Sequence, residues 1–172
     1  RVGGVADLWA VAEDLGALRK ALQAARRQKA KWRLHWPFQD WVVRDGRLAG
    51  LTIRPGSGFE GIQKQEERIV MGAATPWAAL AGLGGGWWDS LTTWPGCPGS
   101  TLSEEEGDRL AGMVEEVVYF RGRGIVTVPA ADDGTVPTLP RTAILISVTL
   151  KRGFLLFDGE DGPQPPHAGR LF

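Results

Sequence analysis

The feature that most constrains the fold is an apolar strand, an amphipathic helix and a second strand, one directly after another. Residues 5–11 form an apolar run interrupted only by Asp7, which predicts a strand. Residues 13–30 carry apolar side chains at three- and four-residue steps, with arginines and lysines between them, which predicts a helix. Residues 31–36 are apolar at alternate positions, which predicts a second strand. This order predicts parallel pairing of the two strands.

Most of the later elements are predicted to be strands. The strands expected after the first βαβ segment lie at residues 41–44, 48–53, 68–74, 114–120, 124–128 and 143–152. The pair at 114–120 and 124–128 is expected to form a hairpin, since only a short glycine-containing turn separates the two runs. Residues 158–170 are rich in proline and glycine and are expected to lack regular structure.

Two short helices are also predicted. Pro76 is suited to the first position of a helix, so a helix is expected to run from there to Leu83, with Thr75 as its N-cap. Three consecutive glycines at 84–86 are expected to end it. Residues 103–106, Ser-Glu-Glu-Glu, have the pattern of a capping box at the start of an acidic helix, which is a structural rather than a catalytic interpretation of those carboxylates.

Composition narrows the classes of function. A chain of 172 residues that is 43% apolar can bury the core of one domain or of two small subdomains. Its 20 basic and 20 acidic residues balance, which argues against nucleic acid or an anionic membrane as partner. The one cysteine, Cys97, excludes an internal disulfide and suits a reducing compartment. With no signal peptide and no long apolar run, a cytoplasmic location is expected. The first residue is Arg1 rather than methionine, so an excerpt of a longer chain is also expected.

Tryptophan is distributed unevenly. All eight tryptophans lie before residue 95, so the first half of the chain has either a large volume to fill or a flat ligand to stack against. The adjacent pair Trp87 and Trp88 follows three glycines. It is interpreted either as an exposed contact patch for a protein partner or as a buried pair.

The loop at residues 94–100, Trp-Pro-Gly-Cys-Pro-Gly-Ser, is the candidate site. Proline presets φ and glycine permits close approach, so backbone N–H groups of such a loop can face a phosphate or a flat ring. The alternative is a tight surface turn, because Pro-Gly pairs are common in turns. A metal site is not expected, since His35 and His167 are far apart in sequence and no cysteine stands at ligand spacing. The glycine fingerprint of a Rossmann fold is missing after the first strand.

Four stretches, in order along the chain, resemble the flavin-binding part of UDP-N-acetylenolpyruvoylglucosamine reductase, the flavoenzyme of peptidoglycan precursor synthesis. The first is Val-Gly-Gly-Val-Ala-Asp-Leu-Trp at residues 2–9, and the longest runs over residues 43–62. The third is Met-Gly-Ala-Ala-Thr-Pro-Trp at 71–77. The fourth is the 94–100 loop, which is similar to the family's Ile-Pro-Gly-Thr/Cys-Val-Gly-Gly/Ser.

The resemblance implies an α+β fold of two lobes with FAD between them. Residues 1–55 would form a small parallel βαβ lobe, residues 56–152 a second lobe on a mostly antiparallel sheet, and residues 153–172 an irregular tail before a missing substrate domain. The residues expected to bind the cofactor are Pro95, Gly96, Cys97, Gly99 and Ser100. In this arrangement, backbone N–H groups of Gly96, Gly99 and Ser100 face the flavin.

The chain departs from the family pattern at four places. Residues 35–40, His-Trp-Pro-Phe-Gln-Asp, stand where the family has the diphosphate loop Gly-x-Gly-Ser-Asn. Residues 105–107, Glu-Glu-Gly, replace Asn-Ala-Gly. The family's substrate-binding arginine matches Arg141, the one expected catalytic residue, although its neighbours differ. Arg170 stands where the family has its proton-donating serine, and a guanidinium is not a proton donor at neutral pH.

The resulting hypothesis is a degenerate relative of the reductase that keeps the fold and has reduced or lost redox activity. Trp36, Trp41 and Trp94 are predicted to fill part of the cofactor cleft. The first alternative is an active FAD-binding, NADPH-dependent oxidoreductase fragment acting on a UDP-sugar. The second is a non-enzymatic binding module that uses the cleft filled by tryptophan for a smaller ligand or a protein partner.

Overall fold

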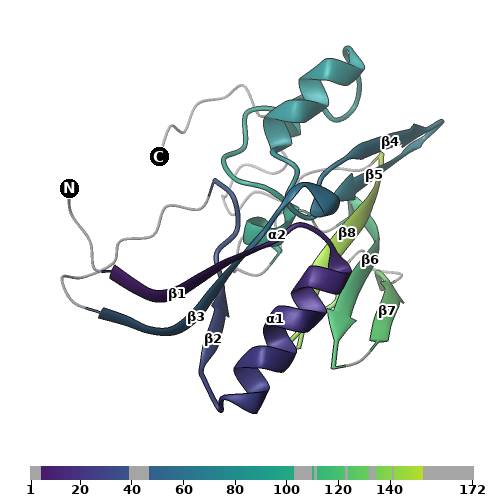
Figure 1. Cartoon of the computed structure of the whole chain (residues 1–172). Helices are drawn as coiled ribbons and strands as arrows, with labels where there is room; N and C mark the ends of the chain where they lie inside the picture. The colour runs from purple at the N-terminus through teal and green to yellow at the C-terminus, as the bar shows by residue number, and fades with distance from the viewer. Residues whose placement is uncertain are drawn as a thin grey trace, which may run out of the picture.

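The computed structural model describes residues 5–38, 47–102, 110, 112–122, 124–131, 135–140 and 142–152 (Figure 1). Its α-helices and strands, in chain order, are β1 (Val5–Ala12), α1 (Leu15–Arg27), β2 (Trp32–Leu34), β3 (Arg47–Pro55), β4 (Ile62–Gln65), β5 (Arg68–Gly72), α2 (Pro98–Thr101), β6 (Val114–Arg121), β7 (Gly124–Pro129) and β8 (Ile144–Lys151). Three 3₁₀ helices, η1 (Ser57–Phe59), η2 (Trp77–Leu83) and η3 (Asp89–Leu91), complete the regular structure of the described residues. The predicted strand at 41–44, the helix start at 103–106 and the tail lie outside them.

The first lobe is a three-stranded parallel sheet in the order β1-β3-β2. The predicted strand–helix–strand unit is present, but β3 lies between β1 and β2, so the two predicted neighbours do not pair. Burial agrees with this order. Thr52 and Ile53 of β3 are completely buried, whereas β1 and the three-residue β2 keep partly exposed side chains. The central strand, with a neighbour on each side, is thus the most buried of the three.

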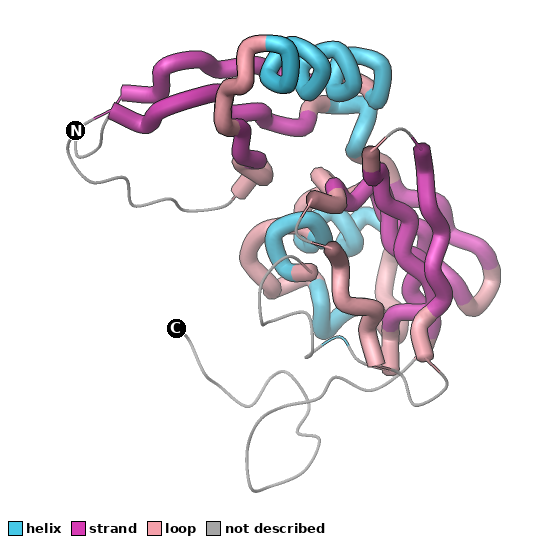
Figure 2. Tube along the Cα trace, turned by 90° about the horizontal axis from the view of Figure 1, so that it is seen from below, coloured by secondary structure: helices cyan, strands magenta, loops and turns pink. Residues whose placement is uncertain are grey.

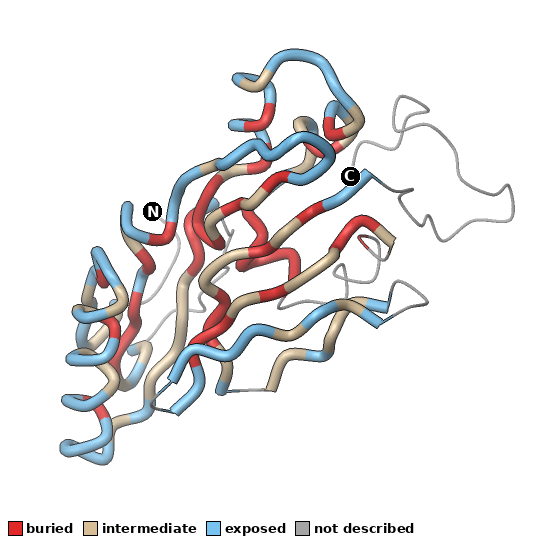
Figure 3. Tube along the Cα trace, turned by 90° about the vertical axis from the view of Figure 1, so that its right-hand side faces the viewer, coloured by how far each residue is buried: buried red, intermediate tan, exposed pale blue. Residues whose placement is uncertain are grey.

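Helix α1 covers one face of this sheet. The Asp14 side chain accepts a hydrogen bond of 2.7 Å from the Ala17 N–H and so caps the helix. Arg26 and Arg27 lie in the last turn, where positive charge is favourable. Leu18 and Ala25 are buried, and Figure 3 shows the buried stripe of the helix turned inward. The apolar face of the amphipathic helix α1 therefore packs on the sheet.

The second lobe is a five-stranded antiparallel sheet in the order β4-β5-β8-β6-β7 (Figure 2). The predicted hairpin forms strands β6 and β7, and the apolar run at 143–152 forms the central strand β8. Strand β4 lies in a polar stretch for which no element was predicted, and its partner β5 holds it in place. An ion pair of 2.6 Å between Arg68 and Glu115 links β5 to β6 across the sheet.

The segment after β5 shows why one predicted cap is wrong. A 3₁₀ helix begins at Trp77 with Pro76 at its N-cap position, and Gly84 ends it with φ +74°. Thr75 does not cap it. Its hydroxyl donates to the Gly61 carbonyl (3.2 Å) and accepts from the Gly61 N–H (2.9 Å), so a contact distant in sequence takes the side chain away from the helix.

Of the tryptophan pair after the three glycines, Trp88 is buried and Trp87 is half-buried. The Trp88 Nε1 donates to the Gly84 carbonyl at 3.1 Å, and the Lys64 ammonium lies 4.6 Å from its ring centroid. The two rings meet edge to face, with centroids 5.5 Å apart. For Trp88 the buried interpretation is therefore the correct one.

Candidate functional site

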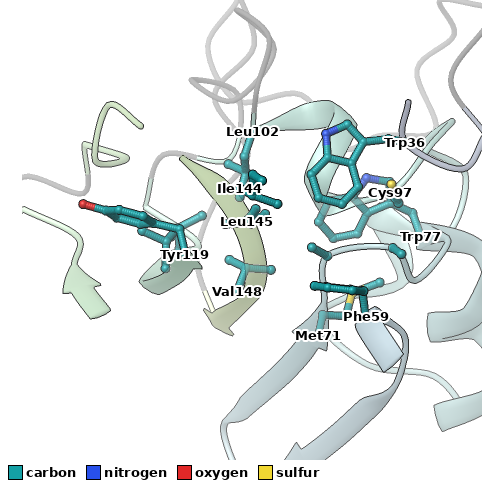
Figure 4. Close-up of a cluster of buried hydrophobic side chains, with 14 of the residues drawn as sticks. Trp36, Phe59, Met71, Trp77, Cys97, Leu102, Tyr119, Ile144, Leu145 and Val148 are labelled. Carbon is teal, nitrogen blue, oxygen red and sulfur yellow. The ribbon is translucent and has the colours of Figure 1, made fainter. Parts of the chain in front are cut away.

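The 94–100 loop is part of the core rather than a projecting surface turn. Gly96 has a φ of +79°, which favours glycine, and Pro98–Thr101 form the single-turn helix α2. Residues 97–100 are buried, whereas Pro95 is exposed. Figure 4 shows Cys97 beside Trp36 and Trp77, with Phe59 and Met71 close to them. Residues 97–100 of the loop predicted to bind a cofactor thus lie in the hydrophobic interior, whereas Pro95 does not.

Two backbone donors of the loop are already used within the fold. The Gly99 N–H donates to the Ala73 carbonyl at 2.8 Å, just after β5. The Cys97 N–H donates to the Ser100 hydroxyl at 3.1 Å, and that hydroxyl in turn donates to the Cys97 carbonyl at 2.9 Å. The Gly96 carbonyl accepts from the Trp77 N–H at 3.2 Å. The N–H groups of Cys97 and Gly99 and the carbonyl groups of Gly96 and Cys97 are thus hydrogen-bonded within the fold.

The indole of Trp36 packs on the backbone of Gly99. A β-carbon placed on Gly99 would lie 2.4 Å from a ring carbon of Trp36, so the indole occupies the space next to this glycine. Trp36 is only 4% exposed. The Cys97 thiol lies 3.5 Å from the Pro37 carbonyl, which ties the same segment to the loop. Trp36 therefore lies against this loop, and its filling of part of a cofactor cleft stays a prediction.

The other two tryptophans predicted to fill the cofactor cleft are Trp94 and Trp41. The Trp94 ring packs edge to face on Trp77, with centroids 6.1 Å apart, and Trp94 is half-buried. Trp41 lies outside the described residues, as does Arg141, so the structure does not place the expected catalytic arginine. In the part of the chain that the structure describes, no group of three His, Cys, Asp or Glu side chains is arranged to hold a metal ion.

Burial makes Cys97 a reporter of this site. Desolvation raises the pKa of its thiol, and hydrogen bonds with Ser100 offset only part of that effect. We expect Cys97 in the native protein to resist a chromogenic disulfide reagent at neutral pH and to react fully in denaturant, because thiolate and access are both lacking. Glutathione under the same conditions is the control. Fast labelling of the native protein would show that the loop opens readily.

A contact that the sequence did not indicate fixes the turn after β3. The Glu13 carboxylate accepts hydrogen bonds from the Ser57 N–H (3.1 Å) and the Ser57 hydroxyl (3.2 Å). β-Carbons on Gly56 and Gly58 would lie 2.3 and 2.2 Å from Glu13 oxygens. Local sequence does not indicate Glu13 as the partner of Ser57, because the two residues are 44 positions apart.

The face of the first sheet opposite α1 carries an aromatic pair. The rings of Trp9 and His35 lie 5.4 Å apart. Trp9 belongs to the edge strand β1, in register with Thr52 of the central strand, and His35 directly follows the other edge strand, β2. Burial, and to a lesser degree the charge of Arg54, lower the pKa of His35. The lowered pKa favours the neutral form of His35, which suits its packing against an indole.

No family model matches the chain. Among curated proteins, the UDP-N-acetylenolpyruvoylglucosamine reductase of Anaeromyxobacter sp. (strain Fw109-5) is 30% identical over 167 residues, which cover 89% of this chain and 52% of that protein. The UDP-N-acetylenolpyruvoylglucosamine reductase 1 of a Bacillus cereus strain is 29% identical over 83 residues, covering 48% of this chain and 28% of that protein. The chain thus spans about half or less of the length of the curated relatives it matches.

Among solved structures, a UDP-N-acetylenolpyruvylglucosamine reductase from Thermus caldophilus superimposes with a TM-score of 0.62 at 23% identity, over 87% of this chain and 56% of that one. The fold is therefore the α+β, two-lobed FAD-binding fold of the peptidoglycan-reductase type, as the family resemblance implied. None of the helices in the described ranges has the length and apolar character of a membrane span.

Proposed function

Because the chain is related to the UDP-N-acetylenolpyruvoylglucosamine reductases, we propose that it is a flavin-domain relative of these enzymes in which NADPH-dependent reduction is lost or much reduced. The matched regions cover only part of the relatives, so their activity and substrate are carried to this chain as part of the proposal. A cytoplasmic location is also part of this proposal.

The observation that carries the proposal is the packing of Trp36 on Gly99. A cofactor held by this loop needs the glycine backbone open on the side from which the ring or phosphate approaches. Here an indole fills that side, and a carbon atom added to Gly99 would overlap it at 2.4 Å. The Gly99 N–H is turned to the Ala73 carbonyl instead. The residues present therefore do not fit FAD at this loop, and we derive no redox step from it.

The segment that carries Trp36 supports the same conclusion. Trp36 and Pro37 are both buried where the family resemblance calls for glycines that approach a diphosphate. The Pro37 carbonyl faces the Cys97 thiol at 3.5 Å. A phosphate in this place would lose its hydration among buried side chains, which is unfavourable for an anion. The bulk and the polarity of the segment thus both oppose a dinucleotide.

The enzymatic alternative is tested by turnover. Wild-type protein, incubated with FAD, is supplied with NADPH and UDP-N-acetylenolpyruvoylglucosamine, and NADPH consumption is followed by absorbance. The Anaeromyxobacter relative serves as the positive control in the same assay. We expect no substrate-dependent oxidation by this chain. Turnover comparable to that of the control would overturn the proposal and favour an active reductase.

A further inference from the structure

Strand β1 leaves an unusual amount of apolar side chain uncovered. Of the seven large hydrophobic residues exposed in the described part of the chain, four lie on it: Val5 (76% exposed), Leu8 (58%), Trp9 (50%) and Val11 (48%). Strand β1 is also an edge strand, since its one partner among the described strands is β3 (Figure 1). An exposed, apolar edge strand of eight residues is a template for pairing with another strand.

The exposed side chains lie on both faces of the sheet. Trp9 is in register with Thr52, and Leu8 is in register with Leu51. Successive side chains of a strand point to opposite faces, so Leu8 projects to the face that carries α1 and Trp9 to the other. A helix or small ligand laid on one face would leave the other side chain exposed. A strand placed beside β1 would cover both.

The backbone of β1 is oriented for such pairing. The Ala12 carbonyl accepts a hydrogen bond from the Gly56 N–H at 2.8 Å, so Ala12 directs its polar groups toward the β3 side. The register of β1 with β3 shifts between Ala6 and Leu8 and is regular from Leu8 to Ala12. Because direction alternates along a strand in a parallel sheet, the N–H and C=O groups of Trp9 and Val11 point away from β3, to the edge that no other described strand covers.

Charge does not oppose contact between two such edges. The β1 sequence, Val-Ala-Asp-Leu-Trp-Ala-Val-Ala, contains no lysine, arginine or proline, the residues with which edge strands usually prevent pairing. Its one charge, Asp7, is paired with Arg47 across the sheet. The formal net charge of the whole chain is zero, so two copies have no net repulsion.

We propose that two copies of this chain associate by antiparallel pairing of β1 with β1, which joins the two small sheets into one. A two-fold axis through the strand pair matches eight residues with eight, whereas head-to-tail pairing would set β1 against the three-residue β2. The contact is small, so it is a weak dimer that forms at micromolar protein concentrations. This inference is independent of the proposed function.

Sedimentation velocity over a range of concentrations tests it. Wild-type protein is expected to shift from monomer toward dimer as concentration rises. Trp9→Lys and Leu8→Lys, on opposite faces, are each expected to remain monomeric, because each brings ammonium groups to the paired edge. Ile125→Lys is the matched control, since Ile125 is 53% exposed on β7, the edge strand of the other sheet, and it is expected to dimerise as wild type does.

Circular dichroism and thermal unfolding show whether each variant is folded. If one of the two β1 variants does not fold, the other still tests the proposal. A wild type that stays monomeric throughout overturns the proposal. So does a dimer that survives both β1 substitutions, or one lost only in Ile125→Lys. A dimer that Trp9→Lys abolishes and Leu8→Lys leaves intact would indicate that one face, rather than the strand edge, is the contact.

Discussion

Replacing Trp36 with glycine is expected to lower the free energy of unfolding by about 3–5 kcal/mol, the range for removing a large buried aromatic side chain. Trp36 is 4% exposed, and its ring fills the space next to Gly99, so its loss leaves a cavity between the 35–38 segment and the 94–100 loop. Denaturant unfolding at equilibrium measures the change. Trp9→Ala, which truncates the half-exposed indole of the same lobe, is the matched control and is expected to cost much less.

The same substitution is expected to increase the affinity for FAD, because it opens the backbone of Gly99 to approach. FAD is titrated into Trp36→Gly and wild type while the remaining tryptophan fluorescence is followed. Trp36→Phe, which keeps a ring in place, should behave as wild type in the titration. If Trp36→Gly unfolds with unchanged free energy and binds FAD no better, the indole does not fill a cofactor position.

Replacing Trp77 with alanine is expected to have an effect of similar size, about 3–5 kcal/mol, with no gain in FAD affinity. Trp77 is completely buried at the start of η2, and its Nε1 donates to the Thr101 hydroxyl at 3.0 Å. Its ring also supports Trp94, whereas the bond to the Gly96 carbonyl comes from the backbone N–H of Trp77, which alanine keeps. Removing the side chain therefore weakens the packing between η2, the loop and α2. Chemical denaturation measures this loss.

Thr101→Val separates the hydrogen bond from the packing. It keeps the volume at position 101, leaves the indole Nε1 of Trp77 without its acceptor and removes the bond from the Thr101 hydroxyl to the Cys97 carbonyl (3.1 Å). The two losses together are expected to cost about 1–3 kcal/mol. A Trp77→Ala loss no larger than that of Thr101→Val would contradict the assignment of Trp77 to the core.

Local pattern was enough to predict most of the strands and the long helix. The three- and four-residue apolar spacing between Leu15 and Ala25 predicted α1, and its buried residues Leu18 and Ala25 follow that spacing. The hairpin of β6 and β7 followed from two apolar runs with a short turn between them. These features depend on residues close together in sequence, so the sequence carries them directly.

Contacts between residues distant in sequence could not be derived in this way. Strand β3 lies between β1 and β2. This order depends on how the three strands pack together in the folded chain, which the pattern within each strand does not specify. The hydroxyl of Thr75 binds Gly61 instead of capping η2. Local sequence could not predict this bond, because the partner is 14 residues away. For the candidate site, the placing of Trp36 at the cofactor cleft came from the family resemblance and not from a local sequence pattern. The structure shows that its indole contacts the backbone of Gly99.

The most direct test of the account is a visible absorption spectrum of the purified wild-type protein, followed by titration with FAD while tryptophan fluorescence is recorded. The account predicts no flavin band and no saturable quenching, because Trp36 occupies the space beside Gly99 and the Gly99 N–H is bound to Ala73. A flavin band, or saturable quenching in the micromolar range, would contradict it. The loop would then be open to the cofactor in solution, and the chain would be a working flavin domain.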